Sequence, residues 1–385
     1  MDDRDRRTVM KFRCERDDLL GAVQFASRAV SNRATLPVLS GLRIEVAEDG
    51  RVGVAATDLE LTMETSFMAN VGEPGRTIVP SRLFGEMARS LSPGQVSVAG
   101  AEGEVEISSG RGQFHVKALA PGDYPALPIE GPSQGDEGAL DVDCGVLATA
   151  LSQVVRAASG DESRQVLTGV LWEVSPGMLS LAATDSYRLA VRSLEVGGGI
   201  GDPRSVVLPA RALQEVGRVL QGSSGRVRAT LRPNLIIFSV GDLGEKTGEL
   251  VIGSRFIEGE FPKYRQLIPE GYSNVLKVEP DRLLEVVRRV GLLARDQMPV
   301  RFRLGTDLEV SAHTPDVGEG QEVLEVEYEG QELVIAFNQQ FLTDGAAAIG
   351  ADRLMLLASD GLKPALLRPE GDNSFTYLLM PVRLN

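Results

Sequence analysis

The chain has 385 residues and a formal net charge of −14 at pH 7, so its surface as a whole repels nucleic acid, and any DNA role needs basic residues gathered on one face. Cys14 and Cys144 are its only cysteines and have no Cys-x-x-Cys spacing, which argues against a disulfide framework or a zinc site. The first residues are charged with no apolar segment behind them, and no run of 18 apolar residues occurs, so the sequence predicts a cytoplasmic chain without a secretory signal or a membrane span.

The first third of the chain predicts many strands and two helices. Residues 1–9 are expected to form a disordered extension, with order beginning at Met10. Apolar residues at helical spacing predict helices over 17–28 and 81–91. Alternating apolar residues predict strands over 42–46, 52–54, 61–63, 96–98, 105–107 and 114–116. The Gly- and Pro-containing stretch 130–138 is typical of a linker.

The remaining chain follows the same order of elements. A helix is expected from Asp143, which can cap its first turn, and another over 210–220. Pro280 suits the first position of a third helix, and Pro381 in the apolar C-terminal segment cannot donate to a central strand ladder. Strands are expected over 170–174, 179–183, 189–194, 231–240, 250–252, 275–278, 300–304 and 324–328. Each third is therefore expected to contain many strands and two helices.

Two passages of the sequence agree in letters and in spacing. Residues 37–41 and 55–58 recur, roughly 128 positions later, as residues 165–169 and 182–185. A fainter third copy begins near Asn274. Repeats of this length are domain-sized. The sequence thus predicts a disordered extension at 1–9 and three similar domains at 10–130, 139–269 and 274–385.

Three features could indicate catalysis, and each has a simpler interpretation. Asp58 and Asp185 could form a catalytic carboxylate pair, but a Thr-Asp at the end of a strand more often hydrogen-bonds a tight turn, and the repeat puts the two in separate domains. His115 and His313 lie in different repeats, which disfavours a triad or a metal site. Residues 197–201 resemble a phosphate loop but lack the Lys-Ser/Thr that would follow, which favours a hairpin or loop.

Basic residues recur on the expected helices of this acidic chain. They are Arg82, Arg89, Arg211, Arg218, Arg282, Arg288, Arg289 and Arg295. An ordinary solvated face accounts for them as well as a surface that neutralises DNA phosphates without reading bases. The residues alone leave both interpretations open.

Short motifs then point to one family. They are Met10-Lys-Phe12, Thr35-Leu-Pro-Val-Leu39, Ala56-Thr-Asp-Leu-Glu60, Thr184-Asp-Ser-Tyr-Arg-Leu-Ala190, Phe261-Pro-Lys-Tyr-Arg265 and Met380-Pro-Val-Arg-Leu384. Each is weak alone, but their order, spacing and repetition are specific. On these motifs the chain resembles the β subunit of bacterial DNA polymerase III, the DNA sliding clamp, from Met10 to Leu384. The segments that end at Arg368 and Leu384 resemble actinobacterial members.

The resemblance implies an α+β DNA-clamp fold with three similar domains per chain. It also implies a head-to-tail homodimer, a ring with helices lining the hole and sheets outside. The ring would be a non-catalytic processivity factor that encircles duplex DNA, with no cofactor and no metal. The matching interface residues are Phe114 and Val116 on one chain with Leu292 and Leu293 on the other. The matching DNA-contacting residues are Arg33, Arg82 and Arg211.

A groove between domains 2 and 3 is also implied, capturing short linear peptides from the replicative DNA polymerase, the clamp loader, repair polymerases and ligase. Its matching residues are Arg164, Leu167, Thr184, Ser186, Arg188, Leu189, Pro262, Leu267, Asn338, Phe341, Leu362, Pro364, Met380, Pro381, Val382, Arg383 and Leu384. Ser186, Tyr187 and Val382 differ from the residues frequent at these positions, which leaves peptide preference open. On the residues alone, a hydrolase using Asp58 or Asp185 and a scaffold that does not bind DNA also stay open.

Overall fold

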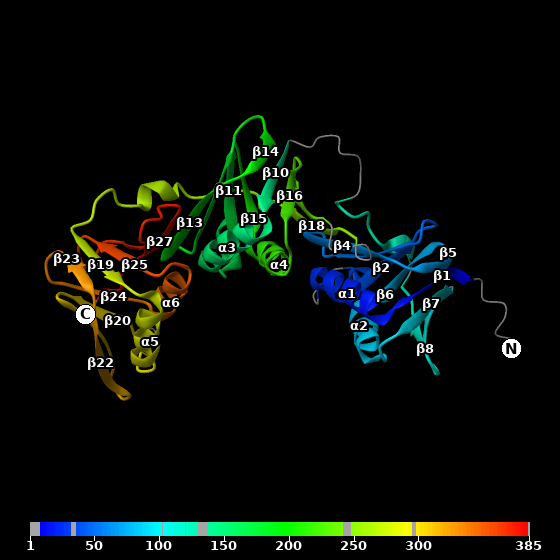
Figure 1. Ribbon diagram of the computed structural model, residues 1–385, viewed down its shortest axis with the longest axis horizontal. Coiled ribbons are helices and arrows are strands. Elements are labelled where there is room, and N and C mark those ends of the chain that lie inside the picture. Colours follow the sequence, from blue (N-terminus) through cyan, green and yellow to red (C-terminus); the bar gives the residue numbers. More distant parts are fainter. Residues whose placement is uncertain are drawn as a thin grey trace. The chain divides into compact units, whose positions relative to one another are not determined.

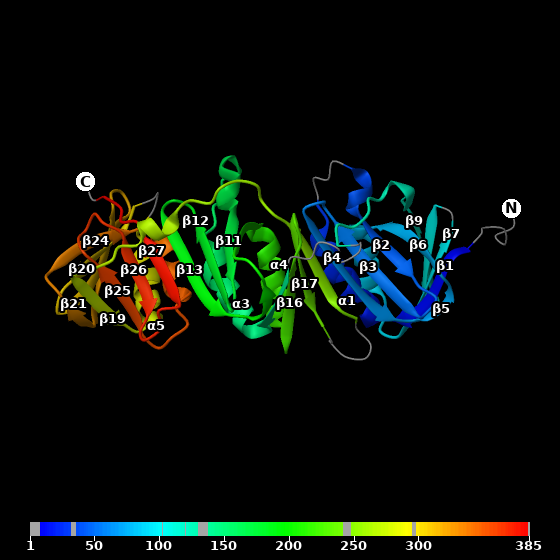
Figure 2. The ribbon, with the colours of Figure 1, turned by 90° about the horizontal axis from the view of Figure 1, so that it is seen from above.

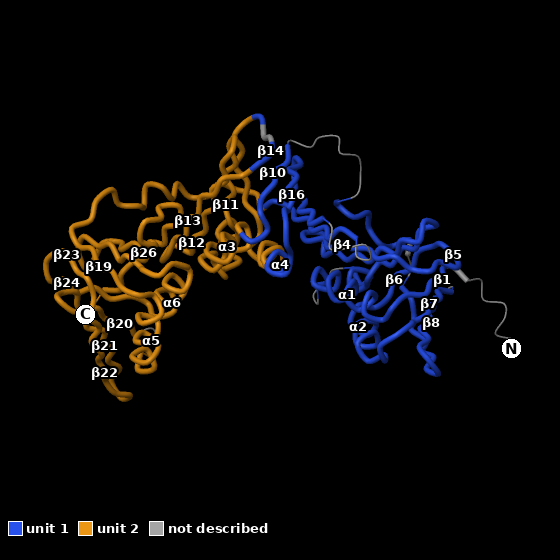
Figure 3. Tube along the Cα trace, in the orientation of Figure 1, with its two compact units in different colours: residues 1–145, 197–201, 218–256 blue, residues 146–196, 202–217, 257–385 orange. Residues whose placement is uncertain are grey.

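The computed structural model describes residues 8–31, 36–101, 103–119, 121–129, 138–241, 248–294 and 298–383. The chain divides into two compact units (Figure 3). Unit 1 comprises residues 1–145, 197–201 and 218–256, and unit 2 comprises residues 146–196, 202–217 and 257–385. The boundary passes through two helices, α3 (Cys144–Val154) and α4 (Ala210–Gln221). The division into three domains stays a prediction.

Unit 1 contains two antiparallel sheets (Figure 1). The smaller sheet has the strand order β5 (Asn70–Glu73), β1 (Thr8–Glu15), β7 (Gln95–Ala101), β8 (Glu104–Ser109), β9 (Gly112–Lys117). The larger sheet has the order β14 (Gly197–Ile200), β10 (Gly138–Asp143), β16 (Arg226–Leu231), β17 (Leu235–Val240), β18 (Leu250–Arg255), β4 (Leu61–Met68), β3 (Arg51–Thr57), β2 (Gly41–Val46), β6 (Gly75–Pro80). Short 3-10 turns lie at Ser27–Ala29, Pro37–Ser40 and Pro121–Asp123.

Two helices of unit 1 pack side by side against these sheets, α1 (Arg16–Ala26) and α2 (Ser81–Ser90). The helical spacing of apolar residues explains the packing, because Leu19 and Val23 of α1 and Phe84 of α2 are all fully buried. Strand alternation works in the same way in β7, where Val96 and Val98 point into the core. The two helices and six strands expected in the first third of the chain are confirmed, with small shifts at their ends.

Unit 2 also contains two antiparallel sheets (Figure 2). The larger has the order β15 (Arg204–Pro209), β11 (Gly169–Ser175), β12 (Met178–Thr184), β13 (Arg188–Glu195), β27 (Phe375–Leu379), β26 (Ala365–Pro369), β25 (Leu354–Ala358), β19 (Asn274–Val278), β23 (Glu327–Glu329). The smaller has the order β22 (Gly318–Glu325), β21 (Asp307–Thr314), β20 (Val300–Leu304), β24 (Leu333–Phe337). Helices α5 (Pro280–Gly291) and α6 (Gln339–Ala347) pack together, and 3-10 turns lie at Val155–Ala157, Glu162–Thr168 and Tyr264–Leu267.

Several expected boundaries were wrong. Strand β1 begins at Thr8, so the last two residues of the expected extension are ordered, while 1–7 lie outside the described residues. The single strand expected over 231–240 is the end of β16, a turn and all of β17, because the chain reverses around Pro233. The expected linker also ends early, since Gly138 already starts β10 and only 130–137 lie outside the described residues.

The glycine run expected to be a loop or hairpin is the edge strand β14, paired with β10. Its sequence allows this pairing because Gly198 adopts φ +93 and a Cβ there would lie 2.2 Å from the carbonyl oxygen of Ala139. The run is therefore a close backbone contact within a sheet. In the part of the chain that the structure describes, no helix is long and apolar enough to cross a membrane.

Candidate functional site

The two Thr-Asp passages form the same turn in the two units. In unit 1, the Thr57 hydroxyl donates to the carbonyl of Leu61, and Asp58 Oδ1 accepts from the backbone N–H groups of Glu60 and Leu61. Leu59, at φ 81, is left-handed. The turn is only four residues long, so the side-chain oxygens satisfy backbone groups that no strand ladder reaches.

In unit 2, Thr184 donates to the carbonyl of Arg188 at 2.6 Å, and Asp185 Oδ1 accepts from the N–H groups of Tyr187 and Arg188. Ser186 is left-handed at φ 82. The predicted turn role of both aspartates is confirmed. Because they lie in different units and their oxygens hold backbone N–H groups, the turns do not support a catalytic pair.

A strand joint in unit 2 brings distant parts of the chain together. Strand β13 follows the second turn and pairs with β27 (Figure 2). In this pairing Arg188 lies opposite Leu379. Beyond β27 the C-terminal segment stays extended, because the N–H of Met380 donates to the carbonyl of Tyr187 and that of Val382 donates to the carbonyl of Ala336, both at 2.8 Å. The apolar tail therefore lies beside the Thr184 turn.

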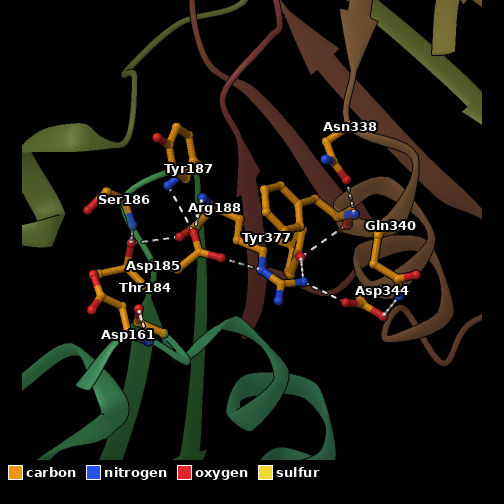
Figure 4. Close-up of polar contacts among 12 residues, drawn as sticks. Asp161, Thr184, Asp185, Ser186, Tyr187, Arg188, Asn338, Gln340, Asp344 and Tyr377 are labelled. Carbon is orange, nitrogen blue, oxygen red and sulfur yellow. Dashed lines mark hydrogen bonds and ion pairs between the residues drawn. The ribbon is translucent and has the colours of Figure 1, made fainter. Parts of the chain in front are cut away.

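Arg188 occupies the centre of this joint and is only 9% exposed (Figure 4). Its Nε donates to Asp185 Oδ2 at 2.9 Å, and its Nη1 donates to Asp344 Oδ2 at 2.6 Å and to the Tyr377 hydroxyl at 3.2 Å. Burial opposes the charge of the guanidinium, but Tyr377, Asp344 and Asp185 outweigh it and raise its pKa. A buried arginine held by two carboxylates links β13, α6 and β27.

Aromatic rings continue this cluster toward the surface. The Arg188 guanidinium lies 4.5 Å from the centre of the Phe341 ring, and Phe341 stacks on Tyr187 with 6.3 Å between ring centres. The Tyr377 hydroxyl donates to the carbonyl of Phe341 at 3.1 Å. Asn338 caps α6 by accepting from the N–H of Phe341. Tyr187, by contrast, is 62% exposed, so it presents one face to solvent.

Arg164 forms a second polar contact at the Thr184 turn. Its Nη1 donates to Ser186 Oγ at 2.9 Å and its Nε to Asp161 Oδ2 at 3.2 Å. Hydrogen bonds from Ser163 lower the pKa of Asp161, which keeps this carboxylate charged. An exposed arginine is thus held in one orientation at the surface of unit 2.

The structure brings the middle of the predicted groove set together, namely Arg164, Thr184, Ser186, Arg188, Asn338, Phe341, Met380 and Val382. Leu189 and Leu167 are buried in the core beneath it, so they can only support a surface. Leu362 at 68% and Leu267 are exposed. Pro262, Pro364, Pro381 and Arg383 also belong to unit 2, whereas Leu384 lies outside the described residues.

The four expected interface residues divide between the units. Phe114 is 42% exposed on β9, the edge strand of its sheet, and Leu292 is 76% exposed just after α5. Leu293 packs toward Gly320 of β22, another edge strand. Val116 is 2% exposed and faces the core of unit 1, so it offers no surface in this structure.

Several of the arginines expected on the helices are exposed in their own units. Arg82 and Arg89 on α2, Arg211 on α4 and Arg288 on α5 are all exposed. Arg82 and Arg89, with Arg28, line a hollow of about 420 Å³ between α1 and α2 in unit 1. Arg33 and Arg295 lie outside the described residues.

The structure adds residues that the sequence did not single out, chiefly Asp344, Tyr377 and Asp161. Asp344 accepts from Arg188, from Gln340 Nε2 at 2.9 Å, and lies 3.8 Å from Arg156. Only its i, i+4 spacing from Gln340 is visible in the sequence. Among the described residues no cluster of His, Cys, Asp and Glu could hold a metal ion.

Family comparisons agree with this arrangement. The models for the N-terminal, central and C-terminal domains of the DNA polymerase III beta subunit match residues 10–128, 141–263 and 265–383. A curated Beta sliding clamp of Synechocystis is 34% identical, over 97% of this chain and 100% of the relative. A Bacillus subtilis DNA polymerase sliding clamp gives a TM-score of 0.89 at 26% identity, covering 98% of this chain and 100% of its own.

A sliding clamp from Bartonella birtlesii, solved bound to griselimycin, gives a TM-score of 0.90 at 29% identity and covers 97% of this chain and 100% of its own. Repeated sheets with helices, matched by these solved sliding clamps over nearly the whole chain, place the fold in the class of DNA clamps. The chain belongs to the DNA polymerase III beta subunit family. It works as a processivity clamp in DNA replication and is not an enzyme.

Proposed function

We propose that two copies of this chain close head to tail into a ring that encircles duplex DNA in the cytoplasm and tethers replication and repair proteins to it. Each copy would contribute three clamp domains, at 10–130, 139–269 and 274–385. The ring would hold DNA by enclosure, so weak contacts that ignore base sequence would suffice.

One observation supports the ring. The same pairing of strands from consecutive repeats occurs twice in the chain, and the two equivalent strands that it leaves lie at sheet edges. The strand after the Thr-Asp turn pairs with the last strand of the next repeat, as β4 with β18 and β13 with β27. In the third repeat the strand equivalent to β4 and β13 is β22. In the first repeat the strand equivalent to β18 and β27 is β9. Each of the two lies at the edge of its sheet. A second copy could pair its β9 with β22, and family membership favours closure after two copies.

Charge at the two edges supports this pairing. Strand β22 carries Glu319, Glu322 and Glu325, whereas β9 and the turn before it carry Arg111 and Lys117. Opposite charges on facing strands stabilise an interface and fix its register. The exposed Phe114 and Leu292 would add an apolar contact at the same joint.

Contact with DNA would come from the arginines on the helices. Exposed arginines on α2, α4 and α5 neutralise phosphates, while the net charge of −14 keeps DNA off the remaining surface. Arg82 and Arg211, together with Arg33, are the proposed contacts.

Partner peptides would bind unit 2 around the Thr184 turn and the C-terminal segment. Tyr187, Leu362 and Met380 expose apolar surface there, and Arg164 and Arg188 hold fixed charges beside it. Such a mixture suits a short peptide with apolar anchors. We propose the seventeen matching residues as this site, and griselimycin, which is bound to the Bartonella relative, as a ligand for it.

Enclosure is tested by loading the protein onto a nicked circular plasmid with the clamp loader and ATP, then linearising half of the sample. We expect protein on circles to survive gel filtration and protein on linear DNA to slide off. Light scattering should also give twice the chain mass of 41.3 kDa. Equal retention on both DNAs, or a monomer at micromolar concentration, contradicts the ring.

Deletion of residues 380–385 tests the peptide site. Calorimetry should show that griselimycin binds the full chain, and that its affinity falls by at least a hundredfold after the deletion while the mass of the dimer is kept. An unchanged affinity contradicts the proposed site.

A further inference from the structure

Asp344 lies where side chains from β13, α6 and β27 meet (Figure 4). Its side chain is 13% exposed. Oδ2 accepts from Arg188 Nη1 at 2.6 Å and Oδ1 accepts from Gln340 Nε2 at 2.9 Å, so both oxygens are directed by neighbours. Asp344 is not among the seventeen residues of the proposed peptide site.

The partners of Arg188 come from opposite sides of the joint. Asp185 is bound to the N–H groups of its own turn, which fixes it on the β13 side. Asp344 belongs to α6, one turn of helix beyond Phe341. Since Nε and Nη1 of Arg188 donate to two different carboxylates, a rotation of the guanidinium breaks at least one of these hydrogen bonds.

The aromatic rings lie next to this guanidinium. The guanidinium lies 4.5 Å from the Phe341 ring centre, and Tyr187 stacks on the same ring and presents the exposed face. Removing one anchor frees Arg188 to turn toward Asp185, which withdraws the charge that holds the Phe341 ring.

We propose that Asp344 is a positioning residue for the peptide site: it holds Arg188 over Phe341 and thereby sets the Phe341 and Tyr187 rings before a peptide arrives. This inference rests on the proposed peptide-binding function. Asp344 itself touches no peptide. Its contribution is preorganisation, because a site whose rings are already in place loses less conformational entropy on binding.

The matched control is Asp372, which accepts from Arg192 Nη1 at 3.0 Å. Arg192 lies on the same strand as Arg188, opposite Phe375 of β27, at the other end of the joint. D372N therefore removes an arginine–aspartate pair between β13 and the turn before β27, away from the aromatic rings. D344N and D372N both keep the size of the side chain and remove its charge.

Calorimetry with griselimycin measures the effect in the full-length dimer. We expect D344N to weaken binding about tenfold and D372N less than twofold, at equal melting temperatures within a few degrees. Tyr377→Phe, which removes the hydroxyl between Arg188 and the Phe341 carbonyl, should weaken binding about threefold. If D344N unfolds the chain, the Tyr377→Phe result decides the question.

A double mutant separates positioning from general loss of structure. In an F341L chain the ring that Arg188 holds is gone, so adding D344N should change the affinity by less than twofold. A full tenfold loss in that background, or equal effects of D344N and D372N, overturns the inference. Loss of binding on deletion of 380–385 with no effect of D344N overturns the inference alone, whereas binding that survives the deletion overturns the proposed site.

Discussion

The two strand joints of the chain share one backbone design and differ in chemistry. At β4–β18 in unit 1, the N–H of Arg255 donates to the carbonyl of Glu60 at 2.9 Å. At β13–β27 in unit 2, the N–H of Met380 donates to the carbonyl of Tyr187 at 2.8 Å. The same Thr-Asp turn precedes each joint, with a left-handed residue at φ 81 in one and φ 82 in the other.

The two joints differ in three successive side chains. Unit 1 has Leu59, Glu60 and Leu61 where unit 2 has Ser186, Tyr187 and Arg188. Leu61 is 3% exposed and only fills a core. Arg188 in the same position must be neutralised, and its guanidinium also lies 4.5 Å from the centre of the Phe341 ring, on which Tyr187 stacks. The turn and the strand pairing therefore build both joints, and the joint in unit 2 adds a buried charge with aromatic rings beside it.

The largest expected effect comes from removing that charge. R188M leaves Asp185 and Asp344 without their cation in a buried place, which should lower the free energy of unfolding by about 3–5 kcal/mol. L61M, the corresponding change in unit 1, conserves volume and should cost less than about 1.5 kcal/mol.

Urea denaturation followed by Trp172 fluorescence measures the first variant, because the single tryptophan of the chain is fully buried in unit 2. Circular dichroism follows the second variant. Equal small losses would mean that the two joints do not differ in the way their side chains indicate.

The sequence predicted the scaffold of this comparison well. Thr and Asp at the end of a strand have one local use, so the turns at Thr57 and Thr184 could be predicted from residues alone. The arginine-bearing helices followed from apolar spacing. Pro233, inside the strand expected over 231–240, was a turn signal that the prediction passed over. The glycines of β14 carry no alternation of side chains, so nothing in their sequence marked a strand.

The contact between Arg188 and Asp344 could not be predicted in the same way. Asp344 is one acid in a chain with 54, and its partner Arg188 is 156 positions away. Only the pairing of β13 with β27 and the packing of α6 bring Arg188 Nη1 to 2.6 Å from Asp344 Oδ2. Val116 illustrates the converse limit: alternation on β9 marks a strand, but it does not show which face of the strand is buried.

A middle-sized effect tests whether the two turns are energetically alike. Thr57 and Thr184 are both buried, and each hydroxyl donates to a carbonyl four residues on and accepts from an N–H two residues on. Replacing either by Val keeps the shape of the side chain and removes the acceptor of the N–H two residues on, which should cost about 1–3 kcal/mol in each unit. Only T184V should also weaken griselimycin binding. Circular dichroism and Trp172 fluorescence follow the unfolding, and losses that differ by more than about 1 kcal/mol would mean that the shared geometry hides unequal turns.

The smallest effect concerns the acids at equivalent positions of β2 and β11, Glu45 and Glu173. Glu173 accepts two hydrogen bonds from Arg265, at 2.8 and 2.6 Å, and one from Tyr264. Burial alone would raise the pKa of Glu173, but these donors outweigh it, so the pKa is lowered from 4.5. Glu45 lies 3.7 Å from Arg43 and is half exposed.

A group whose pKa is lowered in the folded state contributes stability above its ordinary pKa and loses it as the pH falls through the folded value. E173Q should therefore lower the free energy of unfolding by about 1 kcal/mol at pH 7, a figure reduced because Arg265 is largely exposed. The difference from the parent chain should shrink as the pH falls below 4.5 toward the lowered pKa of folded Glu173, because the carboxylate then becomes protonated. E45Q should change stability by less than about 0.5 kcal/mol at any of these pH values. Urea titrations from pH 3.5 to 7 measure both, and a pH-independent difference for E173Q would show that its side chain acts through packing and not through its charge.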